Sequence, residues 1–210
     1  MKFGGSSVSS KRSLECLLNE VKTNLRRNPV IIVSALSGIT KQLKEYAYVK
    51  RDKIASLPRK EYSSEEALME WAEPFYQGIV DFHIDFSKSL GIDFYDQPLN
   101  LDLINSMTST DPNFERSRDL MMSFGERFSA RIIAKYLSEN GIYADAYDAY
   151  NLGLKTDDNY GNATFKRVSY DNISKSVRSL NSLNIPVITG FIGKDDRGEI
   201  TTMGPNSSDD

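Results

Sequence analysis

The chain has 210 residues, of which 40% are hydrophobic and 26% are charged, with a formal net charge of −3 and a pI near 5.4. This composition is typical of a globular protein with one sizeable core and excludes a disordered chain. The acidic balance argues against nucleic acid as a partner, because binding a phosphate backbone requires a basic surface.

Cysteine content and hydropathy restrict the protein further. Cys16 is the single cysteine, so no intramolecular disulfide can form. No apolar run approaches the roughly 18 residues of a membrane span, so we expect no membrane partner. The start of the chain does not resemble a signal peptide, and we expect a cytoplasmic protein.

The first residues combine a lysine, two glycines and two hydroxyls. Gly4 and Gly5 lack a Cβ, so their backbone N–H groups can approach a ligand closely, and Ser6 and Ser7 add hydroxyl donors. Together with Lys2 they could form a phosphate cradle at the start of a helix. An ordinary strand-to-helix turn has the same composition, and the stretch alone favours that turn.

A βαβ unit is predicted at the start of the chain. Residues 1–3 form a short strand, residues 10–27 carry a helical apolar stripe, and residues 30–33 are the continuous β-branched run of a strand buried on both faces. In parallel sheets, ligands bind beyond the carboxyl ends of the strands. We therefore expect the Gly4-Gly5 turn and the loop at residues 34–40 to share one edge.

A helical insertion is predicted at about residues 41–120. It contains two long helices, at residues 41–57 and from residue 63 or 64 to 90, the second of them kinked or divided at Pro74. Residues 93–110 are predicted to be a weakly patterned connector with short helical pieces. The insertion lies between strands and is not a separate domain.

The only cysteine and the only histidine are both predicted to have no chemical role. Cys16 lies opposite the apolar stripe of its helix, which favours an inert surface thiol. His83 lies at the edge of the aromatic stripe without a second histidine or a cysteine nearby, so we expect it to be a packing or surface residue.

A further helix is predicted from Pro112 to Leu137. Gly125 within this apolar run indicates a junction or a close approach to another segment. Glu126 shares a side with Ile133 and is a candidate for a partly buried carboxylate. A first-turn glutamate stabilised by the helix dipole explains the pattern equally well.

The last third of the chain alternates strands with one helix. Strands are predicted at residues 142–147 and 185–189, a helix at 168–183 and a hairpin turn at 194–198, with a turn-rich loop at 154–163.

Five segments resemble motifs of the aspartate kinases, in the order that the family has them. Lys2–Ser7 resembles the opening Lys-Phe-Gly-Gly-Thr/Ser-Ser, and Val33–Thr40 the loop Val-Ser-Ala-x-x-x-x-Thr. Ser123–Ser129 is similar to the helix start Ser-x-Gly-Glu-x-x-Ser, and Thr156–Ala163 to Thr-Asp-x-x-Phe-Gly-x-Ala. Gly190–Asp209 resembles Gly-Phe-Ile-Gly, a hairpin, and then Thr-Thr-Leu-Gly-Arg-Gly-Gly-Ser-Asp. Because the five motifs occur in the family's order, the resemblance is specific. It favours a phosphate cradle at Lys2–Ser7 over an ordinary strand-to-helix turn.

This resemblance implies an α/β fold, the three-layer α/β/α sandwich of the amino-acid-kinase family, with a mainly parallel sheet like that of carbamate kinase. Residues 1–210 would be the amino-terminal, acceptor-binding part of the kinase domain. The implied reaction transfers the ATP γ-phosphoryl group to the β-carboxylate of L-aspartate, the first step of lysine, threonine and methionine biosynthesis. ATP with Mg²⁺ bound through its phosphates is the implied cofactor, and a homodimer is implied for the full-length protein.

The resemblance also assigns roles to residues. It implies catalytic roles for Lys2, which would stabilise the transferring phosphoryl group, and for Asp209, which would organise Lys2 and the Mg²⁺-bound phosphates. The implied phosphate-binding residues are Gly4, Gly5, Ser6 and Ser208. The implied substrate-binding residues are Ser34, Thr40 and Glu126, with Glu126 on the α-ammonium of aspartate. No side chain is implied as a direct metal ligand.

Two departures from the family pattern alter these expectations. Pro205-Asn206-Ser207 stands where the family has Arg-Gly-Gly, and that arginine is expected to bind a substrate carboxylate with two hydrogen bonds. We therefore expect weak or absent aspartate binding unless Arg127 or Arg131 substitutes. Two alternatives stay open: a relative with a different acceptor, or a non-catalytic binding or regulatory relative.

The second departure is length. In the family, a nucleotide-binding half and regulatory ACT domains follow the segment that ends here. We therefore expect the sheet to be incomplete at its C-terminus and the chain to be an amino-terminal fragment, inactive alone.

Overall fold

In the computed structural model, residues 1–56, 65–180 and 183–204 are described. Four strands form a parallel sheet in the order β1-β2-β4-β3. Their bounds are Lys2–Phe3 for β1, Ile31–Val33 for β2, Ala144–Tyr147 for β3 and Ile185–Thr189 for β4. A separate antiparallel hairpin consists of β5 (Ile192–Lys194) and β6 (Ile200–Thr202). All four predicted strands of the sheet and the hairpin are confirmed.

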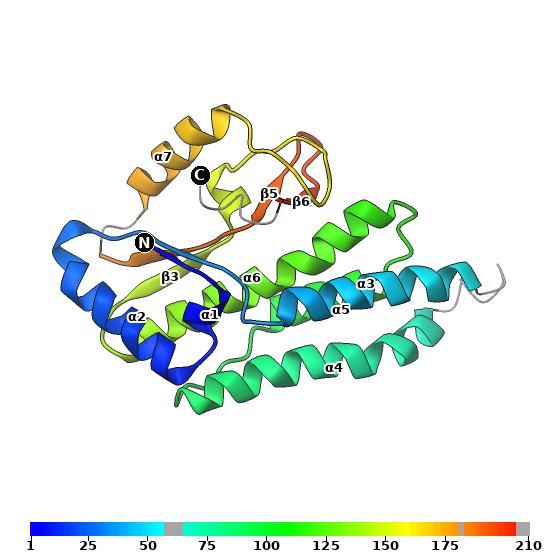
Figure 1. Cartoon of the computed structure of the whole chain (residues 1–210), viewed down its shortest axis with the longest axis horizontal. Helices are drawn as coiled ribbons and strands as arrows, with labels where there is room; N and C mark the ends of the chain where they lie inside the picture. The colour runs from blue at the N-terminus through cyan, green and yellow to red at the C-terminus, as the bar shows by residue number, and fades with distance from the viewer. Residues whose placement is uncertain (57–64, 181–182, 205–210) are drawn as a thin grey trace.

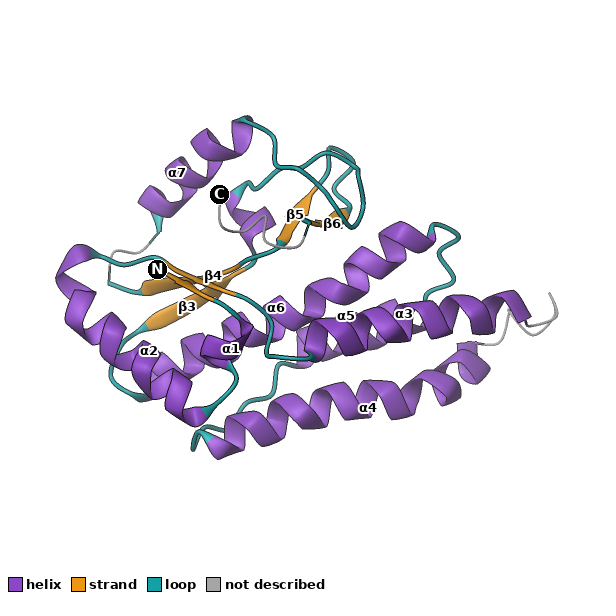
Figure 2. Cartoon of the chain, in the orientation of Figure 1, coloured by secondary structure: helices purple, strands orange, loops and turns teal. Residues whose placement is uncertain are grey.

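Helices cover both faces of the sheet, which gives three layers (Figures 1 and 2). On one face lie α1 (Gly5–Val8), α2 (Lys11–Asn24), which continues into the 3-10 turn η1 (Leu25–Arg27), and α6 (Phe114–Glu139). On the other face lie α7 (Val168–Ser179) and the 3-10 turn η2 (Ala149–Leu152). The three-layer α/β sandwich that the sequence predicts is therefore confirmed.

The two faces of β2 are not buried equally. Ile31 and Val33 are fully buried in the main core against α2 and α6, whereas Ile32, which points the other way, is 37% exposed. The prediction of a strand buried on both faces is therefore wrong for β2. The small cluster under α7 and η2 covers Ile188 on neighbouring β4, but it does not extend over Ile32.

Three helices occupy the range where the sequence predicts an insertion, and they project away from the sheet beside α6 (Figure 1). They are α3 (Ile39–Ser56), α4 (Glu65–Ser89) and α5 (Gln97–Thr108). Aromatic contacts hold α3 to α4, with the ring of Tyr46 5.3 Å from that of Trp71 and 5.0 Å from that of Phe75. The predicted start of the second helix, at residue 63 or 64, lies outside the described residues.

Several sequence expectations within this insertion need correction. The connector predicted at residues 93–110 contains α5, a 12-residue helix capped by Asp96, whose side chain accepts a hydrogen bond from Leu99 N at 2.9 Å. Its polar positions hid the helical pattern. Pro74 lies inside continuous α4, so it does not divide the helix.

The expected positions of the single histidine, in the packing, and of the single cysteine, at the surface, are confirmed. His83 is buried and stacks on Phe128, with ring centroids 4.5 Å apart. Burial lowers the pKa of His83 to about 4. Cys16 is exposed.

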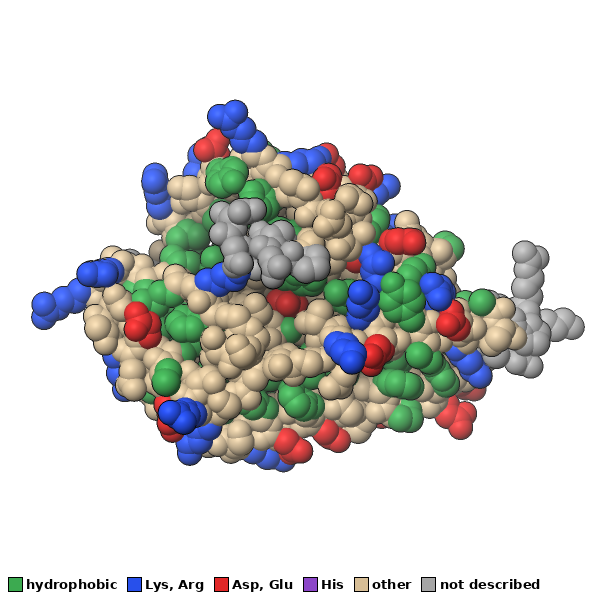
Figure 3. All heavy atoms as spheres, viewed as in Figure 1, with side chains coloured by type: hydrophobic (Ala, Val, Ile, Leu, Met, Phe, Trp, Pro, Cys, Tyr) green, Lys and Arg blue, Asp and Glu red, His purple; other side chains and the backbone are tan. Residues whose placement is uncertain are grey.

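On the face shown in Figure 3, acidic and basic side chains are interspersed. Within the described ranges, none of the helices has the length and apolar character needed to cross a membrane.

Candidate active site

Three loops meet at the carboxyl edge of the sheet and enclose a pocket of about 500 Å³. They follow β1, β2 and β4, and the middle of α6 forms the floor. The lining residues are Lys2, Gly4, Gly5, Ser34, Ala35, Leu36, Ser37, Gly38, Thr40, Glu126 and Phe191. The predicted sharing of one edge by the loops after β1 and β2 is confirmed, and parallel α/β sheets bind ligands at this edge.

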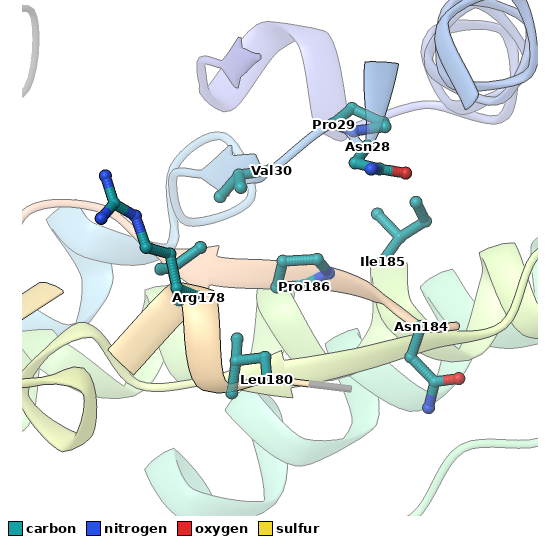
Figure 4. Close-up of a pocket in the computed structure, with 9 residues that line it drawn as sticks. Asn28, Pro29, Val30, Arg178, Leu180, Asn184, Ile185 and Pro186 are labelled. Atoms are coloured by element: carbon teal, nitrogen blue, oxygen red, sulfur yellow. The ribbon is translucent and has the colours of Figure 1, made fainter. Parts of the chain in front are cut away.

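A second pocket lies at the opposite edge, where β2 and β4 begin (Figure 4). It measures about 290 Å³ and has mainly apolar walls, among them Pro29, Leu180 and Pro186. The polar side chains of Asn28 and Arg178 also line it. The amino edge of a parallel sheet lacks the converging loops of the carboxyl edge, so we place the candidate active site in the first pocket.

Close backbone approaches bring the pocket walls together. A Cβ on Gly5 would lie 3.1 Å from the carbonyl oxygen of Ala35, and one on Gly190 would lie 3.2 Å from that of Val33. Larger residues at these positions would push the loops apart. Gly4, in contrast, has no heavy atom within 4 Å of such a Cβ, so its open side can accept a ligand.

Glu126 is the most deeply buried ionisable group of the pocket, with 3% of its surface exposed. Its Oε1 accepts a hydrogen bond from the backbone N–H of Ala35 at 3.3 Å. Its Oε2 is buried and has no hydrogen-bond partner among the described residues. Burial raises the pKa of Glu126 to about 8, which outweighs the lowering effect of the hydrogen bond from Ala35.

The local sequence explains how Glu126 reaches this position. Gly125 lets α6 approach the loop after β2 so closely that a Cβ there would lie 2.8 Å from the Cβ of Ala35. The close approach predicted at Gly125 is confirmed, but the segment at 123–129 is not a helix start, because α6 begins nine residues earlier, at Phe114. The alternative of a first-turn glutamate is therefore wrong.

The structure brings together most, but not all, of the predicted site residues. Lys2, Ser34 and Thr40 line the pocket together with both glycines and Glu126. Ser6 is exposed and is not among the lining residues. Its carbonyl oxygen accepts a hydrogen bond from the Ser13 hydroxyl at 3.2 Å.

Part of the predicted site lies outside the described residues. The segment in question contains Ser208 and Asp209, as well as Pro205, which replaces the family arginine. Within the described ranges, no group of three or more His, Cys, Asp or Glu side chains is placed to hold a metal ion.

The two arginines proposed as substitutes for the family arginine are engaged elsewhere. Arg127 bonds Asp102 at 2.8 Å and lies 3.5 Å from Asp148. Arg131 forms two hydrogen bonds to Asp148, at 2.9 and 3.2 Å, and an ion pair with Asp96 at 3.2 Å. Neither arginine lines the pocket, so the geometry gives no support to the substitution.

Sequence reasoning missed one lining residue with unusual geometry. Phe191, directly after β4, has a φ of +63°, which bulky residues rarely adopt. The backbone there is held by two hydrogen bonds, from Ile192 N to Gly190 O at 2.7 Å and from Met203 N to Phe191 O at 2.9 Å. The sequence did contain one indication that Phe191 lines the site, because the residue directly follows a predicted parallel strand.

Comparison with known proteins gives the chain a family context. The amino acid kinase family matches residues 1–210. The chain is 31% identical over 212 residues to aspartokinase 1, chloroplastic, of Arabidopsis thaliana, covering 100% of this chain and 36% of that protein. It is 33% identical over 109 residues to an aspartokinase of Bacillus sp. (strain MGA3), covering 52% of this chain and 25% of that protein. The chain therefore spans about a third of the length of the Arabidopsis relative.

Solved structures show the same fold. The crystal structure of E. coli aspartokinase III in complex with aspartate and ADP superimposes with a TM-score of 0.74 at 20% identity, covering 99% of this chain and 44% of that chain. Aspartate kinase of Clostridium acetobutylicum gives a TM-score of 0.71 at 22% identity, covering 99% and 42% of the two chains. At these identities the likeness establishes the fold.

Proposed function

Because this chain belongs to the amino acid kinase family, we propose that it is the acceptor-binding part of an aspartate kinase. The proposed reaction is attack of the β-carboxylate of L-aspartate on the γ-phosphorus of ATP, which forms an acyl phosphate and releases ADP. The relatives named aspartokinase support the substrate, as does the E. coli neighbour, which was solved with aspartate and ADP.

The observation that carries the proposal is the buried carboxylate of Glu126. One of its oxygens accepts a bond from Ala35 N and the other has no partner among the described residues. An α-ammonium group has three N–H donors and a positive charge, so it satisfies the free oxygen and compensates the buried charge. An amino acid whose ammonium lies on Glu126 can direct its other end toward the loops at the sheet edge.

The remaining lining residues suit the two ends of the reaction. We assign the phosphoryl group to Lys2 and to the backbone at Gly4 and Gly5, where Lys2 supplies a point charge and the side of Gly4 is open to a ligand. Ser34 and Thr40 offer hydroxyls for the amino acid. Mg²⁺, arriving with the ATP phosphates, supplies charge neutralisation. The protein contributes mainly positioning, which is what phosphoryl transfer requires.

A different acceptor within the same family is the second candidate function. Pro205 replaces the arginine that would bind a substrate carboxylate, and both Arg127 and Arg131 are engaged by aspartates outside the pocket. An acceptor that needs no bidentate arginine satisfies these observations. A panel of L-aspartate, L-glutamate, N-acetylglutamate, UMP and carbamate, assayed with the full-length protein, separates the candidates. N-acetylglutamate has no free ammonium, so a preference for it would contradict the role of Glu126.

The direct test compares Glu126→Gln with the matched variant Glu139→Gln. Glu139 lies at the end of the same helix, is exposed, and forms an ion pair with Lys135 at 3.1 Å. We expect the Kd for L-aspartate, measured by calorimetry, to rise roughly 10- to 150-fold in Glu126→Gln, the loss of one charged hydrogen bond. The Glu139→Gln variant should bind like the wild type. Equal affinity in all three proteins would refute the assignment.

A further inference from the structure

A third pocket of about 370 Å³ lies away from the sheet, between the C-terminal half of α3, the loop after α5 and the start of α6. Its walls are mostly apolar, formed by Ala47, Ile54, Ala55, Pro112 and Phe114. None of its lining residues belongs to the candidate active site.

The pocket contains a buried lysine. Lys50 on α3 is only 4% exposed. Its Nζ donates hydrogen bonds to the Ser106 carbonyl oxygen at 2.9 Å and to the Ser117 hydroxyl at 3.4 Å. Ser117 also lines the pocket, so the amine lies at the pocket wall. An ammonium has three donors, and these two bonds leave one N–H without a partner among the described residues.

Lys50 has no ion pair among the described residues, although the charge of Asp111 raises its pKa by less than burial lowers it. The carboxylate of Asp111 also lines the pocket, and both of its oxygens are bonded by Arg116 at 2.7 Å. No carboxylate of the described residues lies within ion-pair distance of Lys50. Burial lowers the pKa of Lys50 to about 8, which shows the cost of holding this charge away from water.

A second cation lies at the rim. The guanidinium of Arg51 lies 4.8 Å from the ring centroid of Phe114, and its Nε bonds Asp52 at 2.9 Å. The arginines near the pocket are both paired, Arg51 with Asp52 at 2.9 Å and Arg116 with Asp111 at 2.7 Å and Glu199 at 3.1 Å. Lys50, in contrast, has no ion pair among the described residues.

We infer that this pocket is a second ligand site, which binds a small organic carboxylate with an apolar or aromatic body. The carboxylate accepts the remaining N–H of Lys50 and forms the ion pair that Lys50 otherwise lacks, while the body packs on Phe114 and the alanines. A volume of about 370 Å³ is at the small end of the range for such sites. The ligand would bind about ten residues, roughly 15 Å, along α3 from Thr40.

The test uses a matched pair of probes, 4-fluorophenylacetate and its neutral analogue 4-fluorophenylacetamide, observed by ¹⁹F NMR with the wild-type protein. We expect the acid to bind at least tenfold more tightly than the amide. Excess L-aspartate should not displace the acid, because the two sites share no residue. Equal binding of acid and amide, binding of neither, or displacement by aspartate would overturn the inference.

Two variants locate the binding. Lys50→Met keeps the length of the side chain and removes its charge, and Lys53→Met does the same at an exposed lysine one turn away. Only Lys50→Met should abolish the preference for the acid.

Acylation of the wild-type protein at pH 8, followed by mass spectrometry, gives an independent measurement. The acid should protect Lys50 but not Lys53. Unchanged labelling of Lys50 in the presence of saturating acid would contradict the site even if the variants failed to fold.

Discussion

Two carboxylates on α6 are buried in different surroundings. Asp119 and Glu126 are seven residues apart on one helix, and each is at most 3% exposed. Asp119 accepts hydrogen bonds from Arg118 at 3.0 Å and from the backbone N–H groups of Gly161 and Thr202, both at 2.7 Å. Glu126 accepts one long bond, from Ala35. Burial alone therefore does not identify a site residue: the saturated carboxylate joins three segments, and the unsaturated one is available to a ligand.

The largest expected change in stability follows from replacing the saturated carboxylate of Asp119. Asp119→Asn places an NH₂ group or a weaker acceptor against two backbone donors and leaves Arg118 without a counter-charge. We expect the free energy of unfolding to fall by about 3–5 kcal/mol, measured by urea denaturation. Asp85→Asn, at an exposed aspartate, is the control and should change stability by less than about 0.5 kcal/mol. A loss as small as that of the control would show that Asp119 is not a structural residue.

Glu126→Gln is expected to raise the free energy of unfolding at high pH, whereas Asp119→Asn lowers it. The pKa of Glu126 is raised to about 8 in the folded protein, whereas an unfolded glutamate titrates near 4.5, so the folded state binds the proton more tightly between these values. The wild type therefore loses stability as the pH rises from about 4.5 to about 8, and the glutamine variant does not. We expect the variant to be roughly 2–4 kcal/mol more stable at pH 9 and nearly equal at pH 5. A stability difference independent of pH would contradict the burial of an uncompensated carboxylate.

The helix contact that positions Glu126 can be tested at Gly125. A Cβ there would meet the Cβ of Ala35 at 2.8 Å, whereas one at Gly78, inside α4, would meet nothing within 4 Å. We expect Gly125→Ala to destabilise the protein by about 1–3 kcal/mol. Gly78→Ala should stabilise it by about 0.5–1 kcal/mol through helix propensity. Stabilisation by both substitutions would mean that α6 does not depend on this close approach.

The smallest effect is expected outside the pocket. Ser6 is exposed and does not line the pocket, so in the full-length protein Ser6→Ala should change kcat/KM for phosphoryl transfer by less than about twofold. Thr40→Ala, at a hydroxyl that does line it, should lower kcat/KM by roughly 10-fold, the value of about one hydrogen bond. An equal loss in both variants would show that the phosphate cradle extends over Ser6.

The sequence predicts those features of this structure that are determined by residues close to one another in the chain. Strand and helix positions follow from apolar periodicity, and the order of the parallel strands places the loops after β1 and β2 at one edge. The glycine at 125 also signalled a close approach. These features depend on residues near each other in the chain.

The features that the sequence did not predict depend on distant partners. The environment of Glu126 is formed by Ala35, 91 residues away. The exposure of Ile32 depends on where α7 ends its coverage of the sheet. The saturation of Asp119 requires Gly161 and Thr202, which only the folded chain brings to α6. Periodicity carries no information on such contacts.

The central claim is that Glu126 holds an uncompensated buried carboxylate that receives the ammonium group of the substrate. The most direct measurement is a ¹³C NMR titration of the Glu126 side-chain carboxyl, in the free protein and with saturating L-aspartate. We predict a pKa near 8 without ligand, falling by at least one unit when aspartate binds, because an ammonium group favours the charged carboxylate. A pKa near 4.5 in the free protein, or a raised pKa that aspartate leaves unchanged, would contradict the account.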